Sequence, residues 1–467
     1  MSTSDGPGKL EEVKELLADL KTDLKDKRLS AQERLECLEE LKVHGRDPTD
    51  ADPIFEVDGV KVLTNYAFQG ATVKESREAL RVLANALLLK PATRQMLADL
   101  SSGGTDILSR PGAFESVEDE FLSARVLFLL TYGTTVDFDA LVTTGGLATK
   151  LQACLTRHAD PSPTQRTPAL GLMREMALAE TLKLVFNVAH LYPATLGPMS
   201  ACTAPILALL QNMKAPPLKP LVPPITLMLN ALLNLDFTTS TSSSTPTGPQ
   251  TPLYADAVAS LAVERLLTTL DDATKNMAPA ALDAEALPLV AVLRKLYALG
   301  SLTLQHAVET RVLPAEDERV EPLGRSDRTL ASRLLRLSAG ADAPRFGAQA
   351  AVLLYECSGR DAERFVRNVG FGHASGFLAN SGLGVPQGGG GSGRTDVNFV
   401  TGQLLEREEG GEDLEMTVEE KEREAERMFV LFERLRATGV VDVKNPLREA
   451  VESGRLQEVD GEDNDSD

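Results

Sequence analysis

Residues 180–193 read Glu-Thr-Leu-Lys-Leu-Val-Phe-Asn-Val-Ala-His-Leu-Tyr-Pro, and this stretch decides the predicted fold. Its apolar residues share one face of a helix because they are spaced as i, i+3, i+4 and i+7: Leu182, Val185, Phe186 and Ala189. Pro193 has no backbone N–H and marks the end of the helix. The stretch therefore predicts an apolar helix with one amide, Asn187, near its end.

Three other stretches share this design: residues 78–91, 124–132 and 224–237. Each stretch carries an amide or hydroxyl at the corresponding position, and the four positions are Asn85, Thr131, Asn187 and Asn234. They are separated by 46, 56 and 47 residues. A loose period of this size, carried by apolar helices, is typical of helical repeat proteins. We therefore predict an all-α fold, an armadillo/HEAT-like helical repeat solenoid.

The composition of the 467 residues agrees with close packing of helices. Hydrophobic residues make up 43% of the chain but aromatic residues only 4%, and Trp is absent, so Leu and Ala must fill the core. The net charge of −20 argues against nucleic acid and against an anionic membrane surface as partners. We expect no transmembrane segment and no signal peptide. The four cysteines are far apart, which predicts neither a zinc site nor disulfides and favours the cytoplasm.

Four regions follow from shifts in composition. Residues 1–380 form the predicted repeat array, and residues 381–415 are a flexible linker that is rich in Gly and acidic residues. Residues 416–440 form an amphipathic helix, and residues 441–467 are an acidic tail that cannot form a core. The helix is either a last repeat packed on the array or a lid on a partner.

No catalytic motif is present in the sequence. It has no Gly-x-x-x-x-Gly-Lys-Ser/Thr loop, no His-Glu-x-x-His and no Gly-x-Ser-x-Gly elbow. The glycine-rich segment 370–376 is interpreted as a turn between helices. We therefore expect a binding protein that makes and breaks no bonds, uses no metal or cofactor and works as a monomer.

Two groups of polar residues have both a structural and a functional interpretation. The amides of Asn85, Asn187, Asn230 and Asn234 would each cost about 1–3 kcal/mol if they were buried unpaired. They either bond the neighbouring repeat or line a groove and bond a ligand. The second group is a basic cluster, Arg325, Arg328, Arg333 and Arg336. It either pairs with the acidic residues 316–321 or docks an acidic or phosphorylated segment.

Several blocks of the sequence, taken in order, resemble the synembryn family, and its fungal branch in particular. The blocks are residues 85–91, 121–131, 181–187, 322–327, 332–338, 370–378 and 398–403. The resemblance implies a chaperone and guanine nucleotide exchange factor for heterotrimeric G-protein α subunits. It implies that a concave face takes the C-terminal helix of the α subunit, that GDP leaves and that the nucleotide-free state is stabilised. The alternative is an armadillo-type scaffold that binds peptides without exchange activity.

The resemblance also indicates which residues contact the partner. The predicted groove residues are Asn85, Phe128, Phe186, Asn187 and His190. Asn234 is added to them because it occupies the corresponding position in its own repeat. The C-terminal helix would brace the partner through Met428, Phe429 and Phe432. Animal members carry phosphorylation sites that dock on basic residues like Arg333 and Arg336, but Ser392 and Thr417 fit that pattern poorly. Binding to the α subunit would recruit the protein to the cell cortex or the inner face of the plasma membrane.

Overall fold

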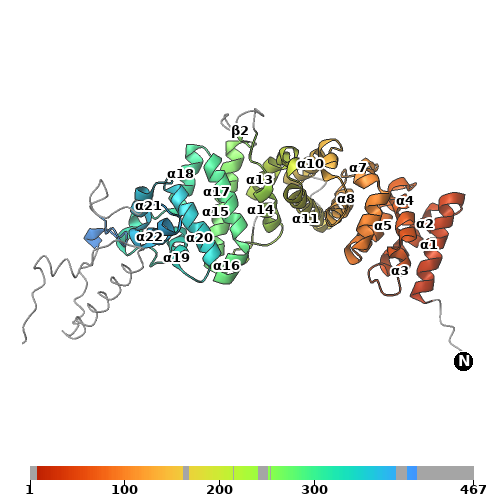
Figure 1. The fold of residues 1–467 in the computed structure, drawn as a ribbon, viewed down its shortest axis with the longest axis horizontal. Helices are drawn as coiled ribbons and strands as arrows, with labels where there is room; N and C mark the ends of the chain where they lie inside the picture. The colour runs from red at the N-terminus through yellow and green to blue at the C-terminus, as the bar shows by residue number, and fades with distance from the viewer. Residues whose placement is uncertain are drawn as a thin grey trace, which may run out of the picture. The chain divides into compact units, whose positions relative to one another are not determined.

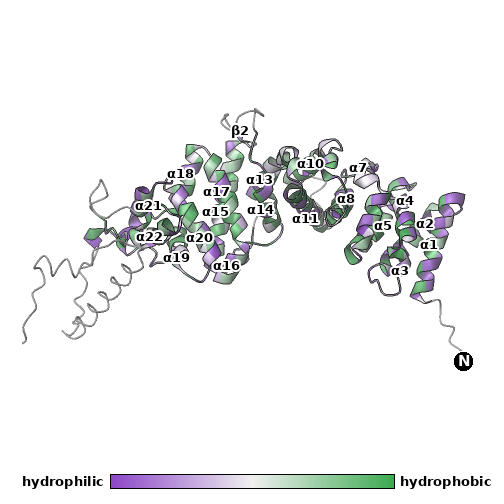
Figure 2. Ribbon diagram, viewed as in Figure 1, coloured by the Kyte–Doolittle hydropathy of each residue, from purple (hydrophilic) through white to green (hydrophobic). Residues whose placement is uncertain are grey.

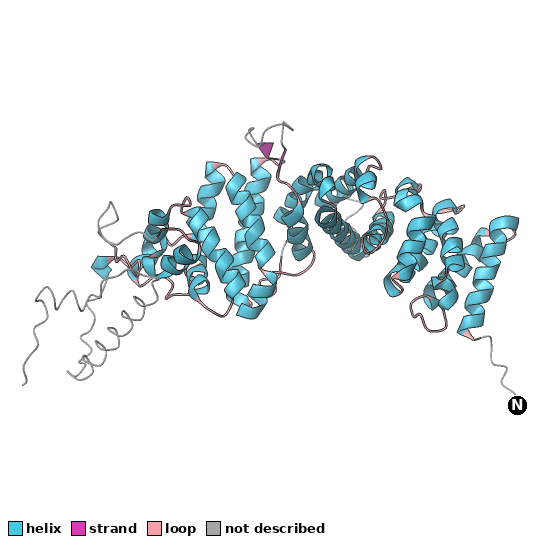
Figure 3. Cartoon of the chain, viewed as in Figure 1, coloured by secondary structure: helices cyan, strands magenta, loops and turns pink. Residues whose placement is uncertain are grey.

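The computed structural model describes residues 8–160, 168–213, 215–239, 251–252, 254–384 and 397–407. These residues form a helical repeat solenoid, which confirms the predicted all-α class (Figures 1 and 3). The strands within the described ranges are limited to β1 (Thr238–Thr239) and β2 (Thr251–Pro252), an antiparallel pair of two residues each.

One layer of the array is a series of helices in which each contacts the next. In chain order these helices are α2 (Ala31–His44), α5 (Val73–Leu89), α8 (Val117–Leu130), α11 (Pro168–Leu191), α14 (Ile225–Asn234), α17 (Leu287–Leu299) and α20 (Pro344–Cys357). We call this series the first layer. The predicted repeats 78–91, 124–132, 180–193 and 224–237 lie in four consecutive members of it, α5, α8, α11 and α14.

A second layer of helices packs on the first, and its helices contact first-layer helices that are near neighbours along the chain. Its principal helices are α4 (Val57–Gln69), α6 (Ala92–Leu100), α10 (Leu147–Ala159), α13 (Thr203–Asn212), α15 (Asp256–Asn276), α18 (Leu302–Val312) and α19 (Leu330–Ala339). Thus α4 contacts α5, α10 contacts α11, and α19 contacts α20. Apolar and polar stripes run along the same helices in Figure 2, as expected of helices that bury one face between layers.

The remaining elements complete the array. They are α1 (Lys9–Asp26), α3 (Asp52–Phe55), η1 (Ser102–Gly104), α7 (Thr105–Ser109), α9 (Phe138–Thr143), η3 (Pro193–Thr195), α12 (Leu196–Met199), η4 (Ser200–Cys202), α16 (Pro279–Glu285), η5 (Glu316–Val320), α21 (Ala362–Val369), α22 (Phe371–Asn380) and η6 (Leu405–Arg407). The chain divides into two compact units, Met1–Gly402 and Gln403–Asp467. The predicted helix 416–440 and the tail 441–467 lie outside the described residues.

Local sequence accounts for where these helices begin. The hydroxyl of Thr72 accepts a hydrogen bond from the backbone N–H of Glu75, and the Glu75 carboxylate accepts one from the N–H of Thr72. This reciprocal pair satisfies two N–H groups that have no partner inside α5. Ser116 caps α8 by accepting a hydrogen bond from the N–H of Asp119. The first turn of α8 is acidic, which suits the positive end of the helix dipole.

Two predicted helices end earlier than expected. The sequence 287–307 reads as one helix, but the chain breaks at Gly300 into α17 and α18. A Cβ on Gly300 would lie 2.5 Å from Leu304 Cδ2 and 2.9 Å from the Leu296 carbonyl oxygen. Because Gly300 has no Cβ, the first turn of α18 can pack closely against the end of α17. Likewise, α14 ends at Asn234, and the apolar residues that follow it are extended but still buried: Leu235 and Phe237.

One stretch within the described ranges, Pro193–Asn212, is long and apolar enough to cross a membrane by length and composition alone. It consists of four consecutive short elements, η3, α12, η4 and α13, and 56% of its apolar window is buried inside the protein. Its apolar character comes from core residues such as Met199, Cys202 and Leu207, which are fully buried.

A buried carboxylate joins three helices in the middle of the array. Glu120 on α8 lies 2.9 Å from His158 Nε2 on α10, and it accepts a hydrogen bond of 2.8 Å from the Thr181 hydroxyl on α11. Its other oxygen is 3.3 Å from the guanidinium of Arg157. Burial alone would raise the pKa of Glu120, but the hydrogen bond and charge of His158, the Thr181 hydroxyl and Arg157 hold it below its usual range. Glu120 therefore stays ionised in the folded protein at neutral pH.

Replacing Glu120 by Gln should lower the free energy of unfolding at pH 7 by about 3 kcal/mol, because it leaves Arg157 and His158 without their buried partner. The lowered pKa of Glu120 means that its carboxylate stabilises the fold above the unfolded value near 4.5, and that this stabilisation is lost as pH falls through the folded value. The difference between wild type and E120Q in urea unfolding should therefore shrink below about pH 4.5. Glu115→Gln, on an exposed residue, serves as the control. A difference that is independent of pH would contradict this account.

Candidate partner-binding surface

The predicted groove residues lie on four consecutive helices of the first layer. Asn85 is on α5, Phe128 on α8 and Asn234 on α14, while Phe186, Asn187 and His190 are all on α11. Because α5, α8, α11 and α14 contact one another in this order, these positions follow the layer from helix to helix. His190 is exposed, Asn187 is buried, and the other four side chains are half-buried.

Aromatic rings and cations from α6, α11 and the carboxyl end of α8 lie close together. The rings of Phe128 and Tyr132 are 5.4 Å apart, edge to face, and Tyr132 is 44% exposed. Lys183 on α11 reaches back to α8, where its Nζ lies 5.8 Å from the centre of the Phe128 ring. Arg94 lies 5.8 Å from the centre of the Tyr132 ring. Each cation in such a position gains about 0.5–1 kcal/mol at an exposed site.

The same face of α11 carries a second ring pair. Phe186 and His190 are stacked with their ring centres 5.6 Å apart and their planes 9° apart. Lys183 is one turn before Phe186, so its contact with Phe128 places the two ring pairs on neighbouring helices. We call the set Phe128, Tyr132, Phe186 and His190 the aromatic surface.

Asn187 has a structural partner on the preceding helix. Its Nδ2 donates a hydrogen bond of 2.7 Å to the hydroxyl of Thr131, and that hydroxyl donates one of 2.6 Å to the Phe128 carbonyl oxygen. Only 4% of Asn187 is exposed. Of the two interpretations of the repeat amides, the bond to the neighbouring repeat therefore applies to Asn187. Asn85 and Asn234 are half-buried and make no side-chain hydrogen bond to another described residue.

Ion pairs also connect the first-layer helices that carry the aromatic surface and the helices that precede them. Glu78 on α5 pairs with Lys42 on α2 at 2.6 Å, and Arg77 on α5 pairs with Glu118 on α8 at 2.6 Å. Arg125 on α8 then pairs with Glu180 on α11 at 3.1 Å, and Glu180 also holds Lys183 at 3.0 Å. The ion pair with Glu180 restricts the position of the Lys183 side chain, and so helps to hold its Nζ over the Phe128 ring.

The four arginines of the predicted docking cluster do not form one exposed group. Arg333 is 2% exposed, forms an ion pair with Asp271 and donates a 3.0 Å hydrogen bond to the Thr274 hydroxyl. It belongs to the contact between α19 and α15, because both of these partners are on α15. Arg325, Arg328 and Arg336 are exposed. Of the acidic residues 316–321, Glu318 accepts hydrogen bonds from the hydroxyls of Thr329 and Ser332.

Met428, Phe429 and Phe432 lie outside the described residues, as do Ser392 and Thr417. Within the described ranges, no group of three or more His, Cys, Asp or Glu side chains comes together to hold a metal ion.

Sequence reasoning missed one member of the aromatic surface, Tyr132, and the two cations that contact its rings, Arg94 and Lys183. A helical spacing was available for one of them, because Tyr132 follows Phe128 by four residues and so lies on the same side of the chain. The contact between Lys183 and Phe128 joins residues on different helices, and no local pattern announces it.

The hydrogen bond between Asn187 and Thr131 can be measured with a double-mutant cycle. Asn187→Ala and Thr131→Val should each lower the free energy of unfolding by about 1–2 kcal/mol, because each leaves a buried polar group without its partner. The double variant should lose less than the sum by about 0.5–1.5 kcal/mol. Asn85→Ala should change stability by less than about 0.5 kcal/mol, since the Asn85 amide bonds no described side chain or backbone group. Strict additivity would show that the two residues do not interact in solution.

Comparison with known proteins assigns the family. A family model described as "Guanine nucleotide exchange factor synembryn" matches residues 37–455. A curated relative, a synembryn-like chaperone of Schizosaccharomyces pombe, is 30% identical over 193 residues, which are 37% of this chain and 35% of the relative. The chain thus matches about a third of the length of that relative. Because the family model covers most of the sequence, this chain belongs to the synembryn family.

Proposed function

We propose that this protein is a chaperone and guanine nucleotide exchange factor for heterotrimeric G-protein α subunits. The family description supports exchange activity, and the name of the yeast relative supports chaperone activity. The aromatic surface is the observation that carries the proposal to particular residues, because it gathers aromatic rings from consecutive first-layer helices and two cations that contact them.

The aromatic surface suits an amphipathic helix as its ligand. Helices bind to other helices through apolar side chains at spacings of three and four residues, and aromatic residues are the usual anchors of such interfaces. Phe128 and Phe186 offer half-buried rings. Lys183 places its positive charge over the Phe128 ring, and Arg94 places its charge over the ring of Tyr132. The C-terminal helix of the α subunit is the ligand that we propose for this surface, with Asn85 and Asn234 beside it.

The proposed mechanism is differential binding. The protein binds the α subunit with its C-terminal helix withdrawn from the nucleotide domain, and so favours the state that has released GDP. GTP binding restores the other state and releases the protein. The same preference for a partly open α subunit accounts for chaperone activity on newly made subunits. No covalent bond changes, and one copy of the protein serves one α subunit.

Release of labelled GDP from a purified α subunit tests the proposal and the surface together. Wild-type protein should accelerate release, and the double variant Phe128→Ala/His190→Ala should do so at least about tenfold less at subsaturating concentration, because the loss of an aromatic anchor costs about 1.4 kcal/mol or more. Leu302→Ala is the matched control, since Leu302 is 83% exposed on α18, in the second layer. Equal activity of the double variant would move the contact to another surface.

Asn187→Ala is avoided in this experiment because Asn187 also joins α8 to α11. Its loss would change stability and confuse the result.

The response of the complex to nucleotide separates exchange from simple scaffolding. The complex with the nucleotide-free α subunit should dissociate when excess GTP is added, because GTP stabilises the state that the protein binds weakly. Size-exclusion chromatography with and without GTP measures this. A complex that is indifferent to GTP would instead support an armadillo-type scaffold.

A further inference from the structure

A short segment returns to the last helices of the array. Residues 397–402, which we call the strap, present carbonyl oxygens that accept hydrogen bonds at consecutive positions. The oxygens of Phe399 and Val400 accept from the N–H groups of Phe371 and Gly372, at 2.9 and 3.0 Å. The oxygen of Thr401 accepts from the N–H of Leu323 at 3.0 Å.

The strap replaces the missing cap of α22. The N-cap residue of this helix is Gly370, which has no side chain and makes no side-chain cap bond. The first N–H groups of a helix have no partner inside it, and here the strap oxygens accept from two of them. The ring of Phe399 also stacks on that of Phe371, with centres 5.1 Å apart.

A buried arginine holds the end of the strap. Arg319 is 5% exposed, and its guanidinium donates to the Gly402 oxygen at 2.8 Å and to the Asn368 oxygen at 2.9 Å. Asn368 is in the last turn of α21, where backbone oxygens favour a positive charge. Arg319 therefore fastens Gly402, the last residue of the first compact unit, to the carboxyl end of α21.

The glycine-rich segment 370–376 now has a physical explanation. Gly370 has a φ of +81°, and a Cβ there would lie 2.9 Å from the Val400 oxygen and 3.1 Å from the Gly402 nitrogen. A Cβ on Gly372 would lie 3.2 Å from the same Val400 oxygen. The glycines thus allow the strap to approach the backbone. The prediction of a turn over 370–376 holds only for Gly370, because residues 371–376 are the start of α22.

We propose that the strap is an anchor that fixes where residues 403–467 leave the helical array, and that this anchor is needed for those residues to act on a bound α subunit. The inference rests on the proposed function, together with the expectation from the family resemblance that the C-terminal helix braces the partner. Gly370, Arg319 and Phe399 are positioning residues in this scheme. They contact the strap or belong to it.

The test is Gly370→Ala in the full-length chain, compared with Gly376→Ala. Gly376 is in the same segment, within α22, and a Cβ there meets no atom within 4 Å. Gly370→Ala should displace the strap, so the amides of Leu323, Phe371 and Gly372 should exchange hydrogen about tenfold faster or more. Acceleration of GDP release should fall by about threefold or more, because the C-terminal residues lose their fixed origin. Gly376→Ala should match wild type in both measurements.

Phe399→Ala is a second variant that keeps every glycine and removes the ring stack. It should give a weaker change in the same direction, and circular dichroism should show the helix content of wild type for both variants. Fast exchange of the three amides with full acceleration of GDP release would overturn the role of the anchor. Unchanged amide exchange in Gly370→Ala would overturn the anchor itself. If wild type neither accelerates GDP release nor aids folding of the α subunit, the proposed function fails, and the amide exchange still decides whether the strap is anchored.

Discussion

The buried carboxylate of Glu120 is the interaction on which the middle of this protein depends. A carboxylate removed from water is costly unless charged and hydrogen-bonding groups surround it. Its partners come from α10 and α11, so the charge of one residue on α8 draws three helices into a single arrangement. Phe128 on α8 and Phe186 on α11 take their relative positions from this arrangement. The two helices that carry the candidate surface, α8 and α11, are thus joined by a buried polar contact. The hydrogen bond from Asn187 to Thr131 is a second polar contact between the same two parts of the chain.

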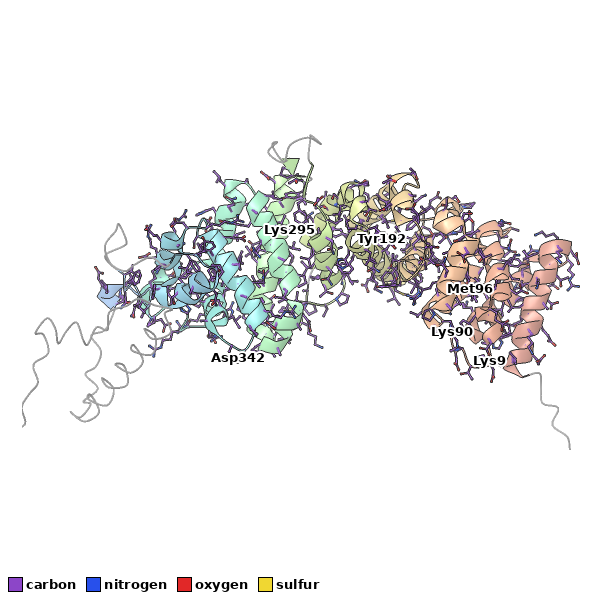
Figure 4. The ribbon with its side chains drawn as sticks, viewed as in Figure 1. Lys9, Lys90, Met96, Tyr192, Lys295 and Asp342 are labelled. Carbon is purple, nitrogen blue, oxygen red and sulfur yellow. The ribbon has the colours of Figure 1, made fainter. Side chains whose placement is uncertain are left out.

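Elsewhere in the first layer, charged groups connect helices that follow one another. Arg34 on α2 pairs with Glu75 on α5, and Arg294 on α17 pairs with Glu356 on α20. Between α14 and α17 the contact differs. Lys295, which is labelled in Figure 4, donates to carbonyl oxygens at the end of α14, including that of Leu233 at 2.5 Å. Partly exposed pairs contribute little to stability, so their main effect is to select one register between apolar faces.

The sequence predicted the all-α repeat fold because apolar spacing within a helix is a local property. Leu80, Leu83 and Leu87 are separated by three and four residues, and all three are fully buried. The errors arose where a distant residue decides the outcome. Arg333 was expected on the surface, but Asp271 on another helix binds it in the interior. The purpose of Gly370 was likewise invisible, because the strap that requires it lies about thirty residues further along the chain. The aromatic surface was found in part through family resemblance, and its cations were not found.

The contacts between near neighbours have a mechanical consequence. In such an array each repeat packs mainly on its neighbours, so small changes in the angle between successive repeats add up and the array can bend along its length. The junction of α8, α10 and α11 is stiffer, because displacing it would strip partners from a buried charge. The aromatic surface therefore lies on a part of the array that bends less than the parts on either side of it. A ligand bound as proposed at Phe128 and Phe186 would keep its geometry while the rest of the array bends.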